Sequence, residues 1–187
     1  NHLRASIESH SGYVFQTVGD AFCAAFESPG EALAASMDAQ IALRDDEDWG
    51  ETGRIHVRMA LYSGAAEQRG SEYFGFILYR ISRLLSTAHG DQILVSHTTQ
   101  ELMRDQLPKS MGLQDMGSFR LKDMQRAEQI FQLLHPELET DFPPLRSLEA
   151  FENNLPVQTA NFIGREKEVE EGMNTPMESG WWSWHPS

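Results

Sequence analysis

Two short apolar runs near the start of the chain predict a β-hairpin. Residues 13–18 and 21–26 are rich in β-branched and aromatic side chains, and only Gly19 and Asp20 separate them. Glycine at the first central position is typical of the type II′ turn, which joins two antiparallel strands. Residues 1–10 carry apolar positions at helical spacing and predict the end of a helix before the hairpin.

A helix is predicted from Ser28 to about Arg44. Serine is a favoured N-cap residue, and the proline that follows it suits the first helical turn. Leu33, Met37 and Ile41 recur at helical spacing, so we expect them on the buried face.

A second helix is predicted over residues 76–88, where the apolar residues form one stripe. At about 100° per residue, Tyr79 and Arg83 lie one turn apart on roughly the opposite face.

The remaining apolar runs predict four strands and a short helix. The strands cover residues 55–61, 93–95, 119–121 and 130–134, and the helix covers residues 98–107. Because strands and helices alternate along the chain, the fold class is α/β or α+β.

The pattern changes after residue 135, so we expect a folded domain over residues 1–135. Residues 136–160 hold a Pro-Pro pair and many acidic residues without a sustained period, which is typical of a linker. The tryptophan-rich residues 173–187 fit neither a helix nor a strand, and we expect a disordered tail there.

Composition limits the function. The chain has 187 residues, and 15 Lys and Arg against 28 Asp and Glu give a formal charge of −13. Proteins that bind nucleic acid carry clusters of Lys and Arg on one face. Because this chain is strongly acidic, we do not expect a nucleic-acid partner. The apolar runs are too short to cross a bilayer, and the single cysteine, Cys23, excludes a disulfide framework. We expect a cytoplasmic protein with no membrane partner.

Asp20 is the first candidate for chemistry. A carboxylate at the tip of a tight hairpin projects from the end of the sheet, where it could hold Mg²⁺, although aspartate is also a favoured turn residue. The sequence contains no G-x-S-x-G, G-x-x-x-x-G-K-[ST], G-x-G-x-x-G or H-E-x-x-H motif. Serine-hydrolase, P-loop, Rossmann and zinc-protease classes therefore have no support.

Five separated blocks, in order along the chain, resemble the class III adenylate/guanylate cyclase catalytic domain. They cover residues 14–26, 57–64, 73–75, 80–84 and 90–96. Residues 113–124 and 130–133 also resemble the closing strands of that domain. The resemblance covers about residues 1–135 and implies a ferredoxin-like α/β sandwich that here lacks its first strand.

The resemblance also implies a site. In the family, two aspartates bind two Mg²⁺ or Mn²⁺ ions, a lysine and an aspartate read the purine, and an asparagine and an arginine stabilise the transition state, all at a dimer interface. By position, Asp20 matches the second metal aspartate and Arg83 the transition-state arginine. Gln16 replaces the lysine, Glu72 the purine-reading aspartate and Tyr79 the asparagine. The first metal aspartate belongs to the opening strand, which this chain lacks.

Two functions follow from the resemblance. As an enzyme, the parent would be a bacterial signalling cyclase that converts a nucleoside triphosphate to a 3′,5′-cyclic nucleotide and pyrophosphate, as a homo- or heterodimer with another cyclase-type domain. This fragment would be inactive, because one carboxylate cannot anchor a two-metal site. Alternatively, the domain is a degenerate cyclase that binds nucleotide or pairs with a partner. Asp20 and Arg83 favour the enzyme, whereas Gln16 and Tyr79 favour the degenerate domain.

A second resemblance lies further along the chain. Residues 154–158, followed by residues 162–166, resemble the entry to a signalling ATPase module, whose start we expect over residues 161–172, although an acidic helix start accounts for the same residues. A cyclase-type domain would then regulate a downstream ATPase. The missing first strand further predicts an open edge inside the sheet and a domain of marginal stability.

Overall fold

The computed structural model describes residues 2–46, 53–146 and 179–186. The helices are α1 (His2–Ser9), α2 (Pro29–Asp45), α3 (Phe76–Thr87) and α4 (His97–Met103). The strands are β1 (Tyr13–Val18), β2 (Ala21–Phe26), β3 (Val57–Gly64), β4 (Glu67–Arg69), β5 (Glu72–Phe74), β6 (Ile93–Ser96), β7 (Gly112–Phe119), β8 (Glu128–Leu134) and β9 (Ser179–Pro186).

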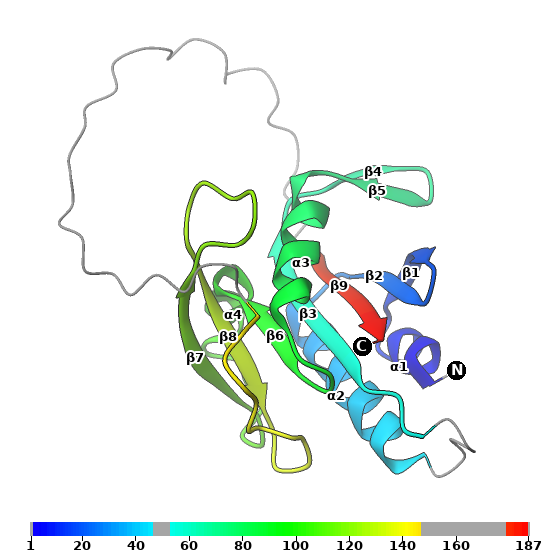
Figure 1. Cartoon of the computed structure of the whole chain (residues 1–187). Helices are drawn as coiled ribbons and strands as arrows, with labels where there is room; N and C mark the ends of the chain where they lie inside the picture. The colour runs from blue at the N-terminus through cyan, green and yellow to red at the C-terminus, as the bar shows by residue number, and fades with distance from the viewer. Residues whose placement is uncertain (1, 47–52, 147–178, 187) are drawn as a thin grey trace, which may run out of the picture.

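Seven of these strands form one mixed sheet in the order β1-β2-β9-β3-β6-β8-β7 (Figure 1). Only β3 and β6 are parallel neighbours, and all other neighbours are antiparallel. Strands β4 and β5 form a separate two-stranded ribbon. The α/β class predicted from the sequence is confirmed.

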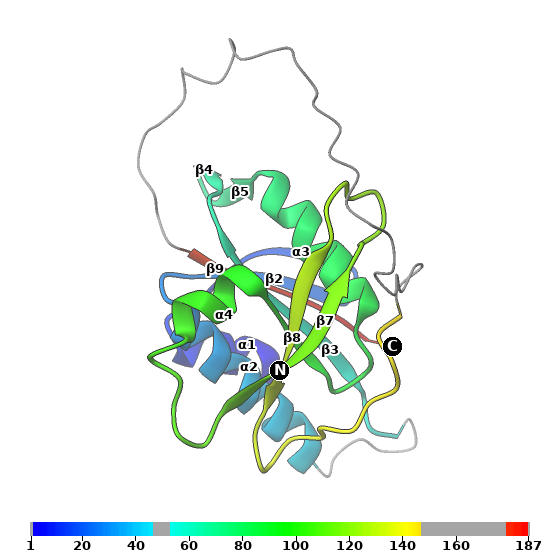
Figure 2. The ribbon, with the colours of Figure 1, turned by 90° about the vertical axis from the view of Figure 1, so that its left-hand side faces the viewer.

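Helices cover both faces of the sheet (Figure 2). One core lies under α1, α2 and α4, and the other lies under α3. Alternate residues of β3 serve the two cores: Met59 and Leu61 belong to the first, whereas Ala60 and Tyr62 belong to the second. In the described part of the chain, the helices lack the length and apolar character that a membrane crossing requires.

The predicted hairpin is confirmed with the predicted strand ends. Val18 pairs with Ala21, so the loop has two residues, and Gly19 has a φ of 62° as the first residue of a type II′ turn requires. The ladder shifts register between Val14 and Gln16, which makes Phe15 the extra residue of a β-bulge.

Helix α2 begins as predicted, but its buried face differs. The Ser28 hydroxyl accepts a hydrogen bond from the Gly30 amide at 3.2 Å and caps the helix. Leu33 is buried, whereas Met37 and Ile41 are only half-buried. The most buried positions include the alanines, because small side chains allow the helix to lie close to the elements beneath it; they are Ala32, Ala35 and Ala39.

The late elements were predicted less well. The strand expected over 119–121 is wrong in position, because β7 covers Gly112–Phe119 and Leu121 lies beyond it. Helix α4 is shorter than predicted and ends at Met103. Strand β7 lies at the edge of the sheet and carries a bulge, so its residues do not alternate cleanly between apolar and polar.

The domain continues past residue 135. Leu145 is 7% exposed and belongs to the core under α3, and the Arg146 amide donates a hydrogen bond to the Thr87 carbonyl at 2.9 Å. The linker predicted directly after His135 is therefore wrong for residues 136–146. The rest of that linker and the ATPase resemblance lie outside the described residues.

The disordered tail predicted over residues 173–187 is wrong for Ser179–Pro186, which form β9. This strand lies inside the sheet, antiparallel to both β2 and β3. An open edge expected in the interior is therefore occupied by the far end of the same chain. The sequence SGWWSWHP has no period-2 alternation of apolar and polar residues, so alternation does not predict this strand.

Candidate functional site

Helix α3 carries a cluster of Tyr79 and Arg83 that also includes Asp123. The Arg83 Nη2 donates to the Asp123 carboxylate at 2.9 Å, and the guanidinium lies 4.7 Å from the centre of the Tyr79 ring. The Tyr79 hydroxyl donates to the same carboxylate at 3.3 Å. The Arg83 Nε has no hydrogen-bond partner among the described residues. The Tyr79 ring and the Asp123 carboxylate together hold the Arg83 guanidinium in one position.

The sequence of α3 explains why these two side chains meet. Ile77, Ile81 and Leu84 are buried, so residues 79 and 83 fall on the other side of the helix, one turn apart. That prediction is confirmed. Asp123 reaches them from the turn after β7, where its φ of 60° places the backbone in the left-handed region that aspartate tolerates.

Asp20 lies at the tip of the β1–β2 turn and is exposed. Its charge acts on Arg58 of β3, whose pKa is lowered by burial and by the Arg146 charge and raised by the Asp20 carboxylate. The Asp20 carboxylate therefore lies within electrostatic reach of one cation, Arg58. Among the described residues, no group of three or more His, Cys, Asp or Glu side chains is arranged to hold a metal ion.

Gln16 and Glu72 are exposed and belong to elements that touch. Phe15, next to Gln16 on β1, packs edge-on against Tyr73, next to Glu72 on β5, with ring centres 5.2 Å apart. The β4–β5 ribbon, which the sequence did not predict, thus brings the neighbourhoods of the two expected purine-side residues together.

A buried polar group beneath α3 was missed by sequence reasoning. Arg80 donates to the Tyr62 hydroxyl at 2.6 Å, and the Tyr62 hydroxyl is hydrogen-bonded to Glu128 of β8. Burial first, and then the Glu128 charge, raise the pKa of Tyr62 to about 12, against the lowering effect of Arg80. Burial also raises the pKa of Glu128. These residues come from three elements distant in sequence, so no local motif reveals them.

One residue of each of these two groups, Arg80 and Asp123, lines a common cavity. Arg80 lies between two rings, 5.4 Å from the centre of Phe76 and 5.8 Å from that of Tyr62. A cavity of about 400 Å³ opens beside it, and its walls are Phe76, Arg80, Asp123, Met124, Gln125 and Arg126. A site of this volume with an arginine in its wall can take an anionic small molecule.

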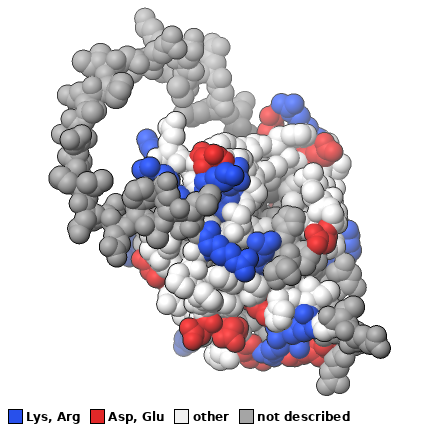
Figure 3. All heavy atoms as spheres, in the orientation of Figure 1, with Lys and Arg blue, Asp and Glu red and all other residues white. Residues whose placement is uncertain are grey.

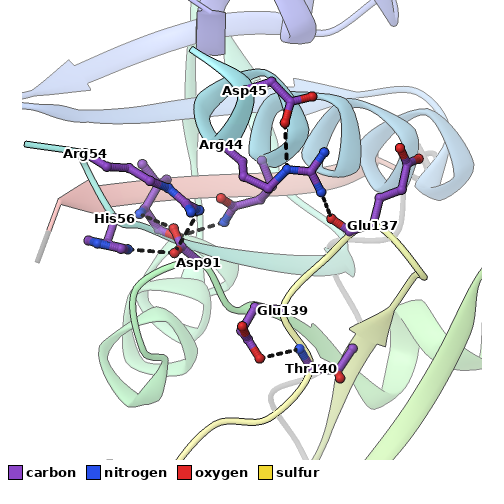
Figure 4. A network of polar contacts seen from close by, with 10 residues as sticks. Arg44, Asp45, Arg54, His56, Asp91, Glu137, Glu139 and Thr140 are labelled. Carbon is purple, nitrogen blue, oxygen red and sulfur yellow. Dashed lines mark hydrogen bonds and ion pairs between the residues drawn. The ribbon is translucent and has the colours of Figure 1, made fainter. Parts of the chain in front are cut away.

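A second polar cluster supports the start of β3 (Figure 4). Asp91 accepts hydrogen bonds from Arg54 at 3.0 Å and His56 at 2.6 Å. Arg44 of α2 donates both to Asp45 and to the carbonyl of Glu137. The cluster ties α2, β3 and the segment after β8 together, which is a structural role.

The surface charge is mixed. On the face drawn in Figure 3, Lys and Arg side chains lie near Asp and Glu side chains. With a formal charge of −13 over the whole chain, a phosphate ligand needs local cations such as those of α3.

Known proteins match this chain in sequence and in structure. No family model matches it. The uncharacterized protein Rv0891c of Mycobacterium tuberculosis is 32% identical over 167 residues, which cover 88% of this chain and 56% of the relative. The uncharacterized protein Rv1359 of the same organism is 30% identical over 170 residues, 87% of this chain and 63% of the relative. The chain thus spans a little over half the length of these relatives.

Solved structures of cyclase domains share the fold of this chain. An adenylate/guanylate cyclase/hydrolase from Silicibacter pomeroyi matches with a TM-score of 0.62 and 22% identity, over 71% of this chain and 76% of that chain. A Trypanosoma brucei adenylate cyclase in its monomeric state matches with a TM-score of 0.64 and 19% identity, over 78% of this chain and 79% of that chain. The guanylate cyclase domain of RhGC from Catenaria anguillulae, in complex with GTP, matches with a TM-score of 0.55 and 14% identity, over 71% of this chain and 78% of that chain. The chain therefore has the fold of the class III adenylate/guanylate cyclase domains.

Proposed function

We propose that this chain is a cyclase-type domain of a bacterial signalling protein. We infer that residues 1–187 bind a nucleoside triphosphate and do not cyclise it. The observation that carries the proposal is the Tyr79–Arg83–Asp123 cluster on a class III cyclase fold. The Arg83 guanidinium, held on the Tyr79 ring, suits a phosphate ligand, and Arg80 and Asp123 line the cavity of about 400 Å³. The neighbour crystallised with GTP supports the ligand class.

The described residues do not fit the two-metal centre that cyclisation requires. Asp20 is the described residue that matches an expected metal ligand, and its surroundings include the cation of Arg58. In-line attack of a ribose hydroxyl on the α-phosphate needs paired metals to neutralise charge. We therefore assign Mg²⁺ or Mn²⁺ no resident site among the described residues, and either ion enters as part of the nucleotide complex.

The substituted positions support binding without turnover. Gln16 can hydrogen-bond a base but carries no charge, and Tyr79 is much larger than asparagine where a ribose would pass. In addition, Asp123 pairs with Arg83, so this cation is partly neutralised before any phosphate arrives. Tyr79 and the Arg83–Asp123 pair alter the two positions expected to stabilise the transition state, whereas Gln16 still offers the base a hydrogen-bonding group.

A second candidate is a weak cyclase formed by a longer parent protein. Asp20 and Arg83, which match a metal ligand and the transition-state arginine, favour it. A dimer with another cyclase-type domain would supply the other half of the site, and a downstream ATPase would be the regulated output.

Fluorescent ATP and GTP analogues test the proposal. Titration of the full chain with Mg²⁺ present should give saturable binding to at least one analogue, and Arg83→Gln should weaken it at least about tenfold, since a charged hydrogen bond is worth about 1.5–3 kcal/mol. Arg104→Gln, an exposed arginine on the surface beyond α4, is the matched control and should bind like the wild type. Equal binding by the Arg83 and Arg104 variants would refute the assigned site.

A further inference from the structure

A small cavity lies within the polar cluster that supports the start of β3 (Figure 4). Its volume is about 100 Å³, and its walls come from α2, from the residues before β3 and β6, and from the segment after β8. The polar lining residues are Gln40, Arg44, Arg54, Asp91, Glu137 and Glu139. These residues differ from those that line the cavity beside α3, so the two sites are separate.

Gln40 contributes a buried oxygen atom to this site. The residue is only 2% exposed, and its Nε2 donates a hydrogen bond to the Val57 carbonyl at 2.8 Å. This bond fixes the orientation of the amide, because a carbonyl can only accept. The Gln40 Oε1 atom has no hydrogen-bond partner among the described residues. A buried acceptor without a donor is costly, so it points to an occupant that donates a hydrogen bond.

Hydrogen bonding within the fold does not account for glutamine at this position. The Val57 carbonyl also accepts a hydrogen bond from the Asp91 amide, at 2.7 Å. An apolar side chain of similar length at position 40 would therefore leave this carbonyl bonded. It would also bury no orphaned oxygen, which favours stability. The glutamine is thus better explained by a ligand than by the packing of α2.

Charged groups of both signs surround the cavity. Arg54 donates to Asp91 at 3.0 Å, and Arg44 donates to the carbonyl of Glu137 and to a neighbouring carboxylate. A guanidinium has five N–H donors, and among the described residues these bonds occupy one donor of Arg54 and two of Arg44. The exposed residues Glu137 and Glu139 add two more carboxylates to the lining. The walls can therefore bind a cationic and an anionic group at once.

We propose that this cavity binds a small zwitterion of the α-amino acid class. The ammonium group of the ligand donates to Gln40 Oε1 and is attracted by Glu137 and Glu139. The carboxylate of the ligand accepts hydrogen bonds from Arg44 and Arg54. A volume of about 100 Å³ admits glycine or alanine but is too small for a nucleotide. The proposal goes beyond nucleotide binding and does not depend on it.

Calorimetric titration of the full chain at pH 7 with glycine and with L-alanine tests the proposal. Both amino acids should bind saturably, and Gln40→Met should weaken binding at least about tenfold, because a hydrogen bond from a charged donor is lost. Methylamine and acetate each carry one of the two charges and should bind at least about tenfold more weakly than glycine. Gln68→Met, at an exposed glutamine of β4, is the matched control and should bind like the wild type.

Thermal unfolding gives a second measurement. Without ligand, Gln40→Met should melt at a higher temperature than the wild type, because it buries no unpaired oxygen. Glycine should raise the melting temperature of the wild type and leave that of Gln40→Met almost unchanged. If Gln40→Met does not fold, Arg54→Gln replaces it in the titration and should weaken glycine binding at least about fivefold.

Three results would overturn the proposal. The first is a wild type that binds neither amino acid, which would leave water as the occupant of the cavity. The second is binding of methylamine or acetate as tightly as glycine, because the site would then recognise a single charge. The third is glycine binding that is unchanged in Gln40→Met or, where that variant does not fold, in Arg54→Gln.

Discussion

Arg83 and Asp123, forty positions apart in the sequence, form an ion pair at 2.9 Å on the exposed side of α3. The pair places a carboxylate where a phosphate of a bound nucleotide would compete for the same guanidinium. Asp123 therefore acts against anion binding even though it holds Arg83 in place on the Tyr79 ring.

Removing the Asp123 charge should strengthen nucleotide binding. Asp123→Asn keeps a hydrogen-bond acceptor for Arg83 but removes a partly exposed ion pair, and such pairs are worth about 0.2–1 kcal/mol. We expect the dissociation constant of a fluorescent nucleoside triphosphate to fall about two- to fivefold. Glu101→Gln, which removes an exposed carboxylate on α4, should leave it unchanged. Weaker binding by Asp123→Asn would mean that the carboxylate positions Arg83 more than it competes.

Tyr62 should make stability depend on alkaline pH. Its pKa is raised from 10 to about 12, so its contribution is complete below pH 10 and is lost as the pH rises from 10 to 12. Tyr62→Phe loses the hydrogen bonds with Arg80 and Glu128. We expect the free energy of unfolding, measured in urea at pH 8, to fall by about 1–3 kcal/mol.

The pH profile separates this effect from simple loss of packing. Between pH 9 and 11 the stability of the wild type should fall more steeply than that of Tyr62→Phe. In an alkaline absorbance titration, the variant should lack the ionisation of Tyr62, whose pKa is about 12. Parallel pH profiles for the two proteins would contradict the assigned cause.

The parts of this fold that depend on neighbours in sequence were predictable. The type II′ hairpin follows from Gly19 and Asp20, and the α3 stripe fixes Tyr79 and Arg83 on one side of a helix. The cap of α2 follows from Ser28 in the same way. Each depends on backbone preferences within a few residues.

The parts that depend on distant residues could not be predicted. Glu128, Tyr62 and Arg80 meet only because β8, β3 and α3 pack together, and no spacing in the sequence records that packing. Leu145 likewise completes a core from a segment with the composition of a linker. Strand β9 was missed because its sequence does not alternate and its partners, β2 and β3, lie far away along the chain.

The cap of α2 offers a local test of the fold. Ser28→Ala removes the acceptor for the Gly30 amide and should reduce the free energy of unfolding by about 1 kcal/mol. Ser86→Ala, on the exposed side of α3, is the control and should cost much less. Equal losses in urea denaturation would show that Ser28 does not cap the helix.

Truncation tests how much the C-terminal part contributes to stability. A chain that ends at residue 135 loses both β9 and Leu145, so its interior strands and its α3 core become exposed. We expect it to bind a hydrophobic dye and to aggregate on concentration, since open strand edges pair with other chains. A chain that ends at residue 146 keeps Leu145 and isolates the effect of β9. A monomeric 1–135 chain that melts cooperatively would contradict this account.

Recovery of the bound nucleotide tests the central claim most directly. The full chain is incubated with ATP or GTP and Mg²⁺ or Mn²⁺, free nucleotide is removed by filtration, and the retained and released nucleotides are identified by mass spectrometry. We expect the wild type to retain an intact triphosphate, Arg83→Gln to retain at least about tenfold less, and neither to release cyclic nucleotide. A cyclic product that disappears in Asp20→Ala, or a wild type that retains no nucleotide, would contradict the account.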